Sequence, residues 1–130
     1  MKPYTYLPSL LLVALFFVGI TSFISLENKK VAPALIDTTM PTWEMAKTHT
    51  LEVLDAMPED KFNFKPSEES KTFASQMVHI AYSVNFFNER MIQGKKVQYQ
   101  EPDPASMSKA EIRAMTEANF DAFIETLRTL

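Results

Sequence analysis

The stretch SKTFASQMVHIAYSVNFFNER, residues 70–90, decides the fold of this chain. Its apolar residues recur at the three- and four-residue spacing of an amphipathic α-helix and not in the alternation of a strand. Ser70 or Thr72 can cap its first turn, and Gly94 can end it. We therefore expect a helix over about residues 70–93.

Three polar residues, Gln76, His79 and Ser83, fall on one line of this helix. Large apolar residues flank the line on both sides, so we expect it to face the interior of a helical bundle. The opposite, water-facing side is then expected to hold Ala74, Ala81, Asn85, Asn88 and Glu89. Because a buried polar group without a partner is costly, the interior strip needs neighbouring side chains, water or a metal ion as partners.

Two more helices flank this one. Pro41 and Pro58 bracket an amphipathic segment that predicts a helix over about residues 41–58. Ser108 and Glu111 form a capping box that opens another helix over about 108–130. The apolar stripes are wide for three helices, so we expect an all-α fold in which three members of a four-helix bundle are present.

The first 25 residues have the pattern of a targeting segment. One early lysine precedes an apolar run from Leu10 to Ile20, which has the length of a signal-peptide core. We expect export with cleavage after about residue 25, a linker over 26–40 and a helical domain over 41–130. The alternative is an uncleaved N-terminal helix that anchors the protein in a membrane through residues 7–24.

Composition removes several function classes. The 130 residues include no cysteine, so disulfides, thiolate nucleophiles and zinc sites built on sulfur are excluded. The net charge is -3 and no basic stripe is present, so nucleic acid is not an expected partner. His49 faces the same way as His79 and is the other candidate imidazole ligand. Two imidazole nitrogens are too few for a tight metal site.

The motifs in order resemble a known family. LEVLDAMPEDKFNFKPSEESKTFASQMVHIAYSVNFFNERMIQGKK, residues 51–96, resembles the DinB-like helical bundle domain of bacteria, and SMSKAEIRAMTEANFDAFIETLRTL, residues 106–130, is similar to its third helix. The resemblance covers about residues 43–130. It implies a four-helix bundle with a long link between helices two and three. The family's metal site takes one histidine from helix two, which corresponds to His79, and an H-x-x-x-H pair from helix four.

The resemblance implies a divalent ion, zinc, nickel or iron, that activates water or a thiol. A thiol-dependent transferase or a hydrolase acting on a small molecule is the expected reaction class, with Gln76 and Ser83 lining the site. His49 matches no family ligand. The alternative is a non-catalytic helical module that forms a homodimer or binds a partner through its open apolar face. A metal-free protein with a concentration-dependent mass would favour that alternative.

We predict that the reading frame carries an H-x-x-x-H helix beyond residue 130, because His79 supplies only one of the three imidazoles that the resemblance implies. Sequencing the gene across codon 130 in its source DNA checks this. A stop codon directly after Leu130 would contradict it and would return His79 to the role of a core histidine.

Overall fold

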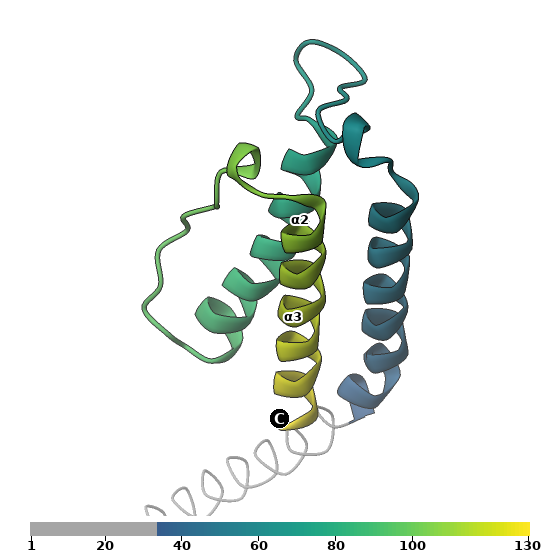
Figure 1. The fold of residues 1–130 in the computed structure, drawn as a ribbon. Coiled ribbons are helices and arrows are strands. Elements are labelled where there is room, and N and C mark those ends of the chain that lie inside the picture. Colours follow the sequence, from purple (N-terminus) through teal and green to yellow (C-terminus); the bar gives the residue numbers. More distant parts are fainter. Residues whose placement is uncertain (1–33) are drawn as a thin grey trace, which may run out of the picture. The chain divides into compact units, whose positions relative to one another are not determined.

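The computed structural model describes residues 34–130, and every regular element in that range is helical (Figure 1). The expected all-α class is therefore confirmed for this part of the chain. The expected targeting segment, residues 1–25, lies outside the described residues. Among the helices of 34–130, none has the length and apolar character needed to cross a lipid bilayer.

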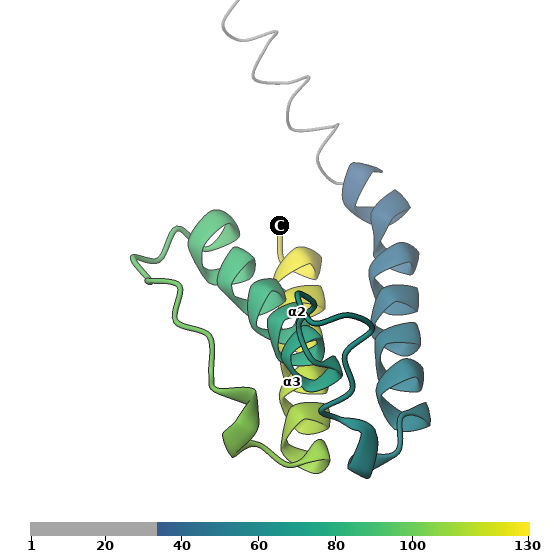
Figure 2. The ribbon, with the colours of Figure 1, turned by 90° about the horizontal axis from the view of Figure 1, so that it is seen from above.

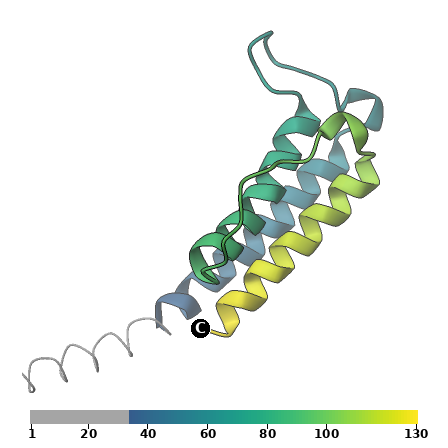
Figure 3. The same cartoon turned by 90° about the vertical axis from the view of Figure 1, so that its left-hand side faces the viewer.

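The elements follow each other in a simple order. A first helix covers residues 34–56 of the described part. It is followed by the 3₁₀ helix η1 (Glu59–Lys61), α2 (Phe73–Phe87), the π-helical turn η2 (Asn88–Ile92), the 3₁₀ helix η3 (Pro104–Ser106) and α3 (Lys109–Arg128). The long connection between η2 and α3 runs beside α2 (Figures 1 and 3).

The first helix differs from the expectation at its start. Residues 34–40, which we expected to belong to a linker, are already helical, and Pro41 lies inside the helix. Proline is common in the first turn of a helix, so Pro41 indicated a start. It is tolerated here at an exposed position, where the missing N–H costs one backbone hydrogen bond. The helix ends at residue 56, two residues before the predicted limit.

The N-terminus of α2 is held by the connection that precedes it. The first backbone N–H groups of a helix have no partner within the helix. Here the N–H of Phe73 donates to the carbonyl of Phe64 at 3.0 Å, and that of Ala74 donates to the carbonyl of Phe62 at 2.9 Å. Thr72 adds a side-chain cap to the first turn. The helix therefore begins three residues later than predicted, at a start that its own connection fixes.

The face of α2 that packs inside is not the one we predicted. Ala74, Ala81 and Asn88, expected on the water-facing side, are only 5%, 0% and 1% exposed. Met77 and Val78 share this buried face, and the side-chain amide of Asn119 on α3 donates to the carbonyl of Ala81 at 3.0 Å. Alanine has a small side chain that lets another helix approach closely, and that advantage does not show in its hydropathy.

The hydrophobic core joins all three helices and the connection after the first. Its fully packed members are Leu54, Phe62, Ala74, Met77, Val78 and Ile112. The rings of Phe62 and Phe73 meet edge to face, 5.3 Å apart. At the other end Trp43 packs edge to face on Phe123, with 4.5 Å between ring centroids. The connection that carries Phe62 is thus part of the core.

Exposed ion pairs set the register of the first helix against α3. The pairs are Glu44 with Arg128, Lys47 with Asp121 and Asp55 with Arg113, at 2.8, 2.6 and 2.9 Å. As residue numbers rise along the first helix they fall along α3, so the two helices are antiparallel. Each exposed pair contributes only about 0–1 kcal/mol, so the pairs define alignment more than stability.

The C-terminal end of α2 changes its winding. In η2 the N–H of Gln93 reaches back five residues to the carbonyl of Asn88, at 2.9 Å. The buried Asn88 side chain accepts from the Gln93 amide at 3.3 Å, and that amide also donates to Thr126 of α3 at 3.1 Å. Gly94 has a φ of 67° and ends the helix there, as predicted.

The capping box at the start of α3 forms as the sequence indicates. The Ser108 N–H donates to the Glu111 carboxylate at 2.8 Å, and the Glu111 N–H donates to the Ser108 hydroxyl at 3.3 Å. We expect Ser108→Ala to lower the free energy of unfolding by about 1 kcal/mol in urea titrations. An unchanged midpoint would show that packing alone fixes this helix start.

The same box makes stability depend on pH. The backbone and side-chain hydrogen bonds from Ser108 lower the pKa of Glu111 below its ordinary value. A lowered carboxyl pKa stabilises the folded protein above the unfolded-state pKa, and this is lost as the pH falls through the folded-state pKa. Glu111→Gln should therefore flatten acid unfolding curves. Glu125→Gln is the control, because that carboxylate makes only an exposed ion pair.

Candidate functional site

The site is built around His79, which lies near the middle of α2. Because α2 turns Val78 and Ala81 toward the core, the imidazole between them in sequence leaves the helix on another side. Its side chain is 45% exposed, so it is not the interior residue we expected. It stands at the edge of the bundle, where solvent and a ligand can both reach it.

The partner of His79 comes from the connection between η2 and α3. Nδ1 of His79 lies 2.9 Å from Oε2 of Glu101 and 3.0 Å from the Tyr99 hydroxyl. That hydroxyl donates to the same carboxylate oxygen at 2.7 Å and lies 3.3 Å from Oγ of Ser83. Four side chains from α2 and the connection thus form one hydrogen-bonded network. Two of them, His79 and Ser83, were already candidate site residues in the sequence.

The charge state of Glu101 fixes the protons of the network. Burial raises the pKa of this carboxyl, but hydrogen bonds from Tyr99 and His79 and the charge of Lys71 outweigh it, so the net pKa is lowered. Glu101 is therefore ionised at neutral pH and can only accept. Nδ1 of His79 must then carry the proton that it shares with Glu101. In the neutral imidazole this leaves Nε2 with a lone pair.

Tyr99, the tyrosine of the network, is also a hydrogen-bond donor to Glu101. Burial, and then the hydrogen bond to Glu101, raises the pKa of Tyr99 above its ordinary value, so the phenol keeps its proton. Since that single proton goes to Glu101, Ser83 must donate to the Tyr99 oxygen. Both Ser83 Oγ and His79 Nε2 are left with lone pairs that can accept.

Aromatic contacts clamp the connection onto α2. The ring of Tyr99 lies edge to face with those of Tyr82 and Phe86, at 5.0 and 5.1 Å. The hydroxyl of Tyr82 also accepts from the backbone N–H of Gln100 at 3.0 Å. These contacts hold Glu101 in place beside His79. An exposed ion pair with Lys71, at 3.9 Å, adds little energy but orients the lysine.

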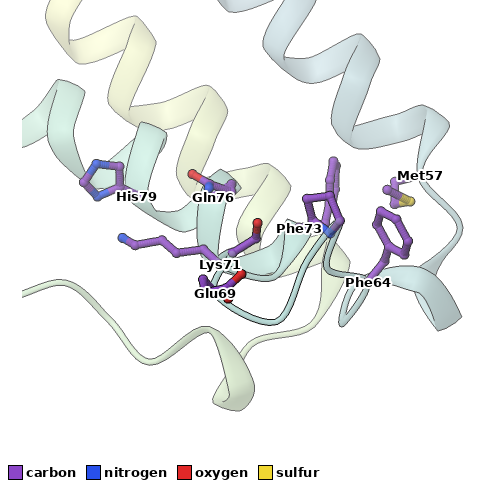
Figure 4. Close-up of a pocket in the computed structure, with 9 residues that line it drawn as sticks. Met57, Phe64, Glu69, Lys71, Phe73, Gln76 and His79 are labelled. Carbon is purple, nitrogen blue, oxygen red and sulfur yellow. The ribbon is translucent and has the colours of Figure 1, made fainter.

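Two cavities adjoin His79. The first, of about 620 Å³, extends to the connection before α2. Figure 4 shows its polar end, where Lys71 and Gln76 lie near His79, and its apolar end at Phe73, Phe64 and Met57. Gln76, predicted to line the site, does line this cavity, although its side chain is exposed and not interior.

The second cavity, of about 400 Å³, lies on the other side of His79. We call it the apolar groove; its lining is Trp43 of the first helix, Phe123 of α3, and His79, Ile80, Ser83, Val84 and Phe87 of α2. It therefore lies between the first helix, α2 and α3. His79 and Ser83 are its polar residues.

His49, the second predicted imidazole, is placed elsewhere. Its side chain is 65% exposed, and its Nδ1 lies 3.0 Å from the carboxylate of Glu52, one turn further along the same helix. It lines neither cavity beside His79. The expectation that it faces the interior with His79 is therefore wrong. The first helix turns Leu54 inward and leaves Val53, four residues after His49 and on the same helix face, 54% exposed.

The donor chemistry suits one metal ligand and its orienting group. Histidine ligands commonly donate their other ring N–H to a carboxylate, as His79 does to Glu101, which leaves Nε2 for the ion. Within residues 34–130 no group of three or more histidine, aspartate or glutamate side chains gathers closely enough to hold an ion. The described residues therefore fit one position of a metal site and do not complete it.

Comparison with known proteins gives the family. A model of the DinB superfamily matches residues 42–130. The chain belongs to the DinB superfamily. No curated protein and no solved structure matches it. The matched range begins within the first helix and includes α2, the connection and α3, so the DinB-like domain contains the whole network around His79.

The sequence did not reveal Tyr99, Glu101 and Lys71 as site residues. The segment KKVQYQEPDP, residues 95–104, is polar and carries two prolines, which indicates a linker. Its one signal was Tyr99 and Glu101 at a spacing of two, which places both side chains on one side of an extended chain. Nothing in the sequence said that this side returns to α2.

We predict that His79 is found with its proton on Nδ1, because the ionised Glu101 accepts it. Long-range ¹H–¹⁵N spectra of the imidazole at mildly alkaline pH distinguish the two tautomers. Glu101→Ala should shift His79 toward a mixture of both. Glu52→Ala, which removes the exposed carboxylate beside His49, is the matched control. An unchanged His79 spectrum in Glu101→Ala would contradict the proton assignment.

Proposed function

We propose that this DinB-like domain provides His79 as one ligand of a divalent metal ion and forms a binding site beside it. The observation that supports this is the 2.9 Å hydrogen bond from Nδ1 to the ionised Glu101, which orients the ring and leaves Nε2 as the donor atom. The metal is zinc, nickel or iron, the ions to which imidazole is suited. Its chemistry is activation of a bound water or thiol.

The remaining ligands come from residues outside 34–130 or from another protein chain. In a four-helix bundle, a helix beside the groove between the first helix and α2 could supply two imidazoles one turn apart. The apolar groove and the large cavity lie along that side of α2. The reaction class that we propose is a thiol-dependent transfer or a hydrolysis on a small molecule.

The roles of the chain's own residues follow from the network. Glu101 fixes the tautomer and the direction of the ring. Tyr99, held between the aromatic rings of α2, keeps Glu101 in place and supplies it with a hydrogen bond. Lys71 and Gln76 present polar groups to a substrate in the large cavity. None of these roles requires a charged side chain to be buried without a partner.

We further propose that residues 1–25 direct export, with cleavage, and that an uncleaved segment over 7–24 is the alternative. The support is the apolar run after Lys2. The intact mass of the protein from a membrane-free fraction distinguishes the two, since cleavage removes the whole segment. Recovery of the uncleaved chain in the membrane fraction would contradict export of a free domain.

A second candidate function is self-association. Large apolar side chains stay exposed on the described residues, among them Met45 (53%), Val53 (54%), Phe64 (56%) and Phe87 (51%). Such residues in number mark contact surfaces more often than free surface. Phe87 also lines the apolar groove, so a second copy that covered Phe87 would compete with a ligand for that part of the surface.

We predict that the full natural protein binds Co²⁺, used as a spectroscopic substitute, through His79. His79→Ala should abolish the visible absorption of the bound ion. Glu101→Gln should weaken binding about 10–100-fold, because it removes the orienting carboxylate. His49→Ala is the control and should bind like the wild type. Binding of equal affinity in His79→Ala would rule out the proposed ligand.

A further inference from the structure

The apolar groove has a composition that restricts what it can hold. Its walls are aromatic and branched side chains, and no charged residue lines it. A volume of about 400 Å³ falls in the usual range for small-molecule sites, roughly 300–1,000 Å³. A charged ligand would lose its hydration there without gaining a counter-charge. The groove therefore suits a neutral, mainly apolar molecule.

The polar groups that His79 and Ser83 present to the groove are both acceptors. Ser83 uses its proton on the Tyr99 oxygen, 3.3 Å away, and His79 uses its Nδ1 proton on Glu101. What remains for a ligand is a lone pair on Ser83 Oγ and one on His79 Nε2. A ligand carbonyl or ether oxygen would meet no donor from these two side chains. A ligand hydroxyl, amine or thiol hydrogen would meet two acceptors.

We propose that the apolar groove binds a small, neutral, aromatic or branched molecule and accepts a hydrogen bond from its single donor group at His79. This binding belongs to the metal-free domain and goes beyond the proposed function, because a metal ion on Nε2 would take the lone pair that the ligand's donor group needs. The binding itself needs no metal. In the metal-free protein Nε2 keeps its lone pair, so the two proposals are tested separately.

Trp43 makes the test direct. It is the only tryptophan of the chain and it lines the groove. A brominated ligand in the groove quenches its emission by heavy-atom contact. The probes are 4-bromophenol, which is neutral at neutral pH and has one donor, and 4-bromoanisole, its methyl ether, which has none. Both are titrated into the metal-free 130-residue protein in the presence of EDTA.

We expect saturable quenching by both probes, with the phenol bound about fivefold more tightly, the ratio that one typical hydrogen bond provides. His79→Leu should remove this ratio and keep the binding of the ether. Phe87→Ala, which removes an exposed wall of the groove, should weaken both probes. Phe64→Ala is the matched control, because that exposed ring lines only the other cavity.

Three outcomes would overturn the inference. Equal affinities for phenol and ether in the wild type would mean that His79 accepts nothing. Quenching that rises linearly without saturation would mean that no site exists. An unquenchable Trp43 in a protein with the mass of a dimer would mean that a second copy fills the groove. Loss of Co²⁺ binding overturns the metal proposal alone, because these titrations contain no metal.

Discussion

The close packing of α2 against α3 through alanine is the constraint on which the site depends. Ala74 and Ala81 are buried to 5% and 0% exposure, and the carbonyl of Ala81 accepts a side chain of α3. Side chains this small allow the helix backbones to approach. They also fix the rotation of α2 about its own axis. Once that rotation is set, His79 can only stand at the bundle edge, facing the groove beside the first helix.

The network around His79 combines residues of α2 with residues of the connection between η2 and α3, which packs on α2. The connection between η2 and α3 adds Tyr99 and Glu101, and the rings of α2 hold that connection down (Figure 2 shows its course from above). The result is an imidazole with a fixed proton and an open nitrogen. In the neutral imidazole, Nε2 can bind a metal ion or accept a hydrogen bond, but only one of these at a time. One histidine therefore supports both proposals as alternative states.

Much of the architecture could be predicted from local signals. The capping box of Ser108 and Glu111 and the positive φ of Gly94 are short-range features, and the structure confirms them. Family membership came from several weak motifs in a fixed order, and the superfamily match over residues 42–130 confirms it. Features of this kind can be predicted without knowing which helix faces pack together.

The burial of α2 could not be predicted in the same way. Alanine is only weakly apolar and asparagine is polar, so neither marks a core face as clearly as a large apolar residue does. Yet α2 buries Ala81 because it is small, and buries Asn88 with a hydrogen bond from Gln93. The face of α2 that packs in the core is therefore opposite to the predicted one. His79 was expected to need a partner because it would face the interior; it has a partner, although its side chain is 45% exposed. That partner, Glu101, is 22 residues away on an irregular segment, and no local pattern could identify it.

The two ends of α2 are held by different kinds of hydrogen bond. This difference determines which substitutions each end can accept during evolution. At the N-terminal end two backbone N–H groups of α2 donate to the backbone carbonyls of Phe62 and Phe64. Every amino acid has a backbone carbonyl, so a substitution at either position does not remove the acceptor of these hydrogen bonds. At the other end the fastening uses the side chains of Asn88, Gln93 and Thr126. There a single change of side chain removes a bond, whereas the backbone hydrogen bonds at the N-terminal end do not depend on which residue supplies the carbonyl.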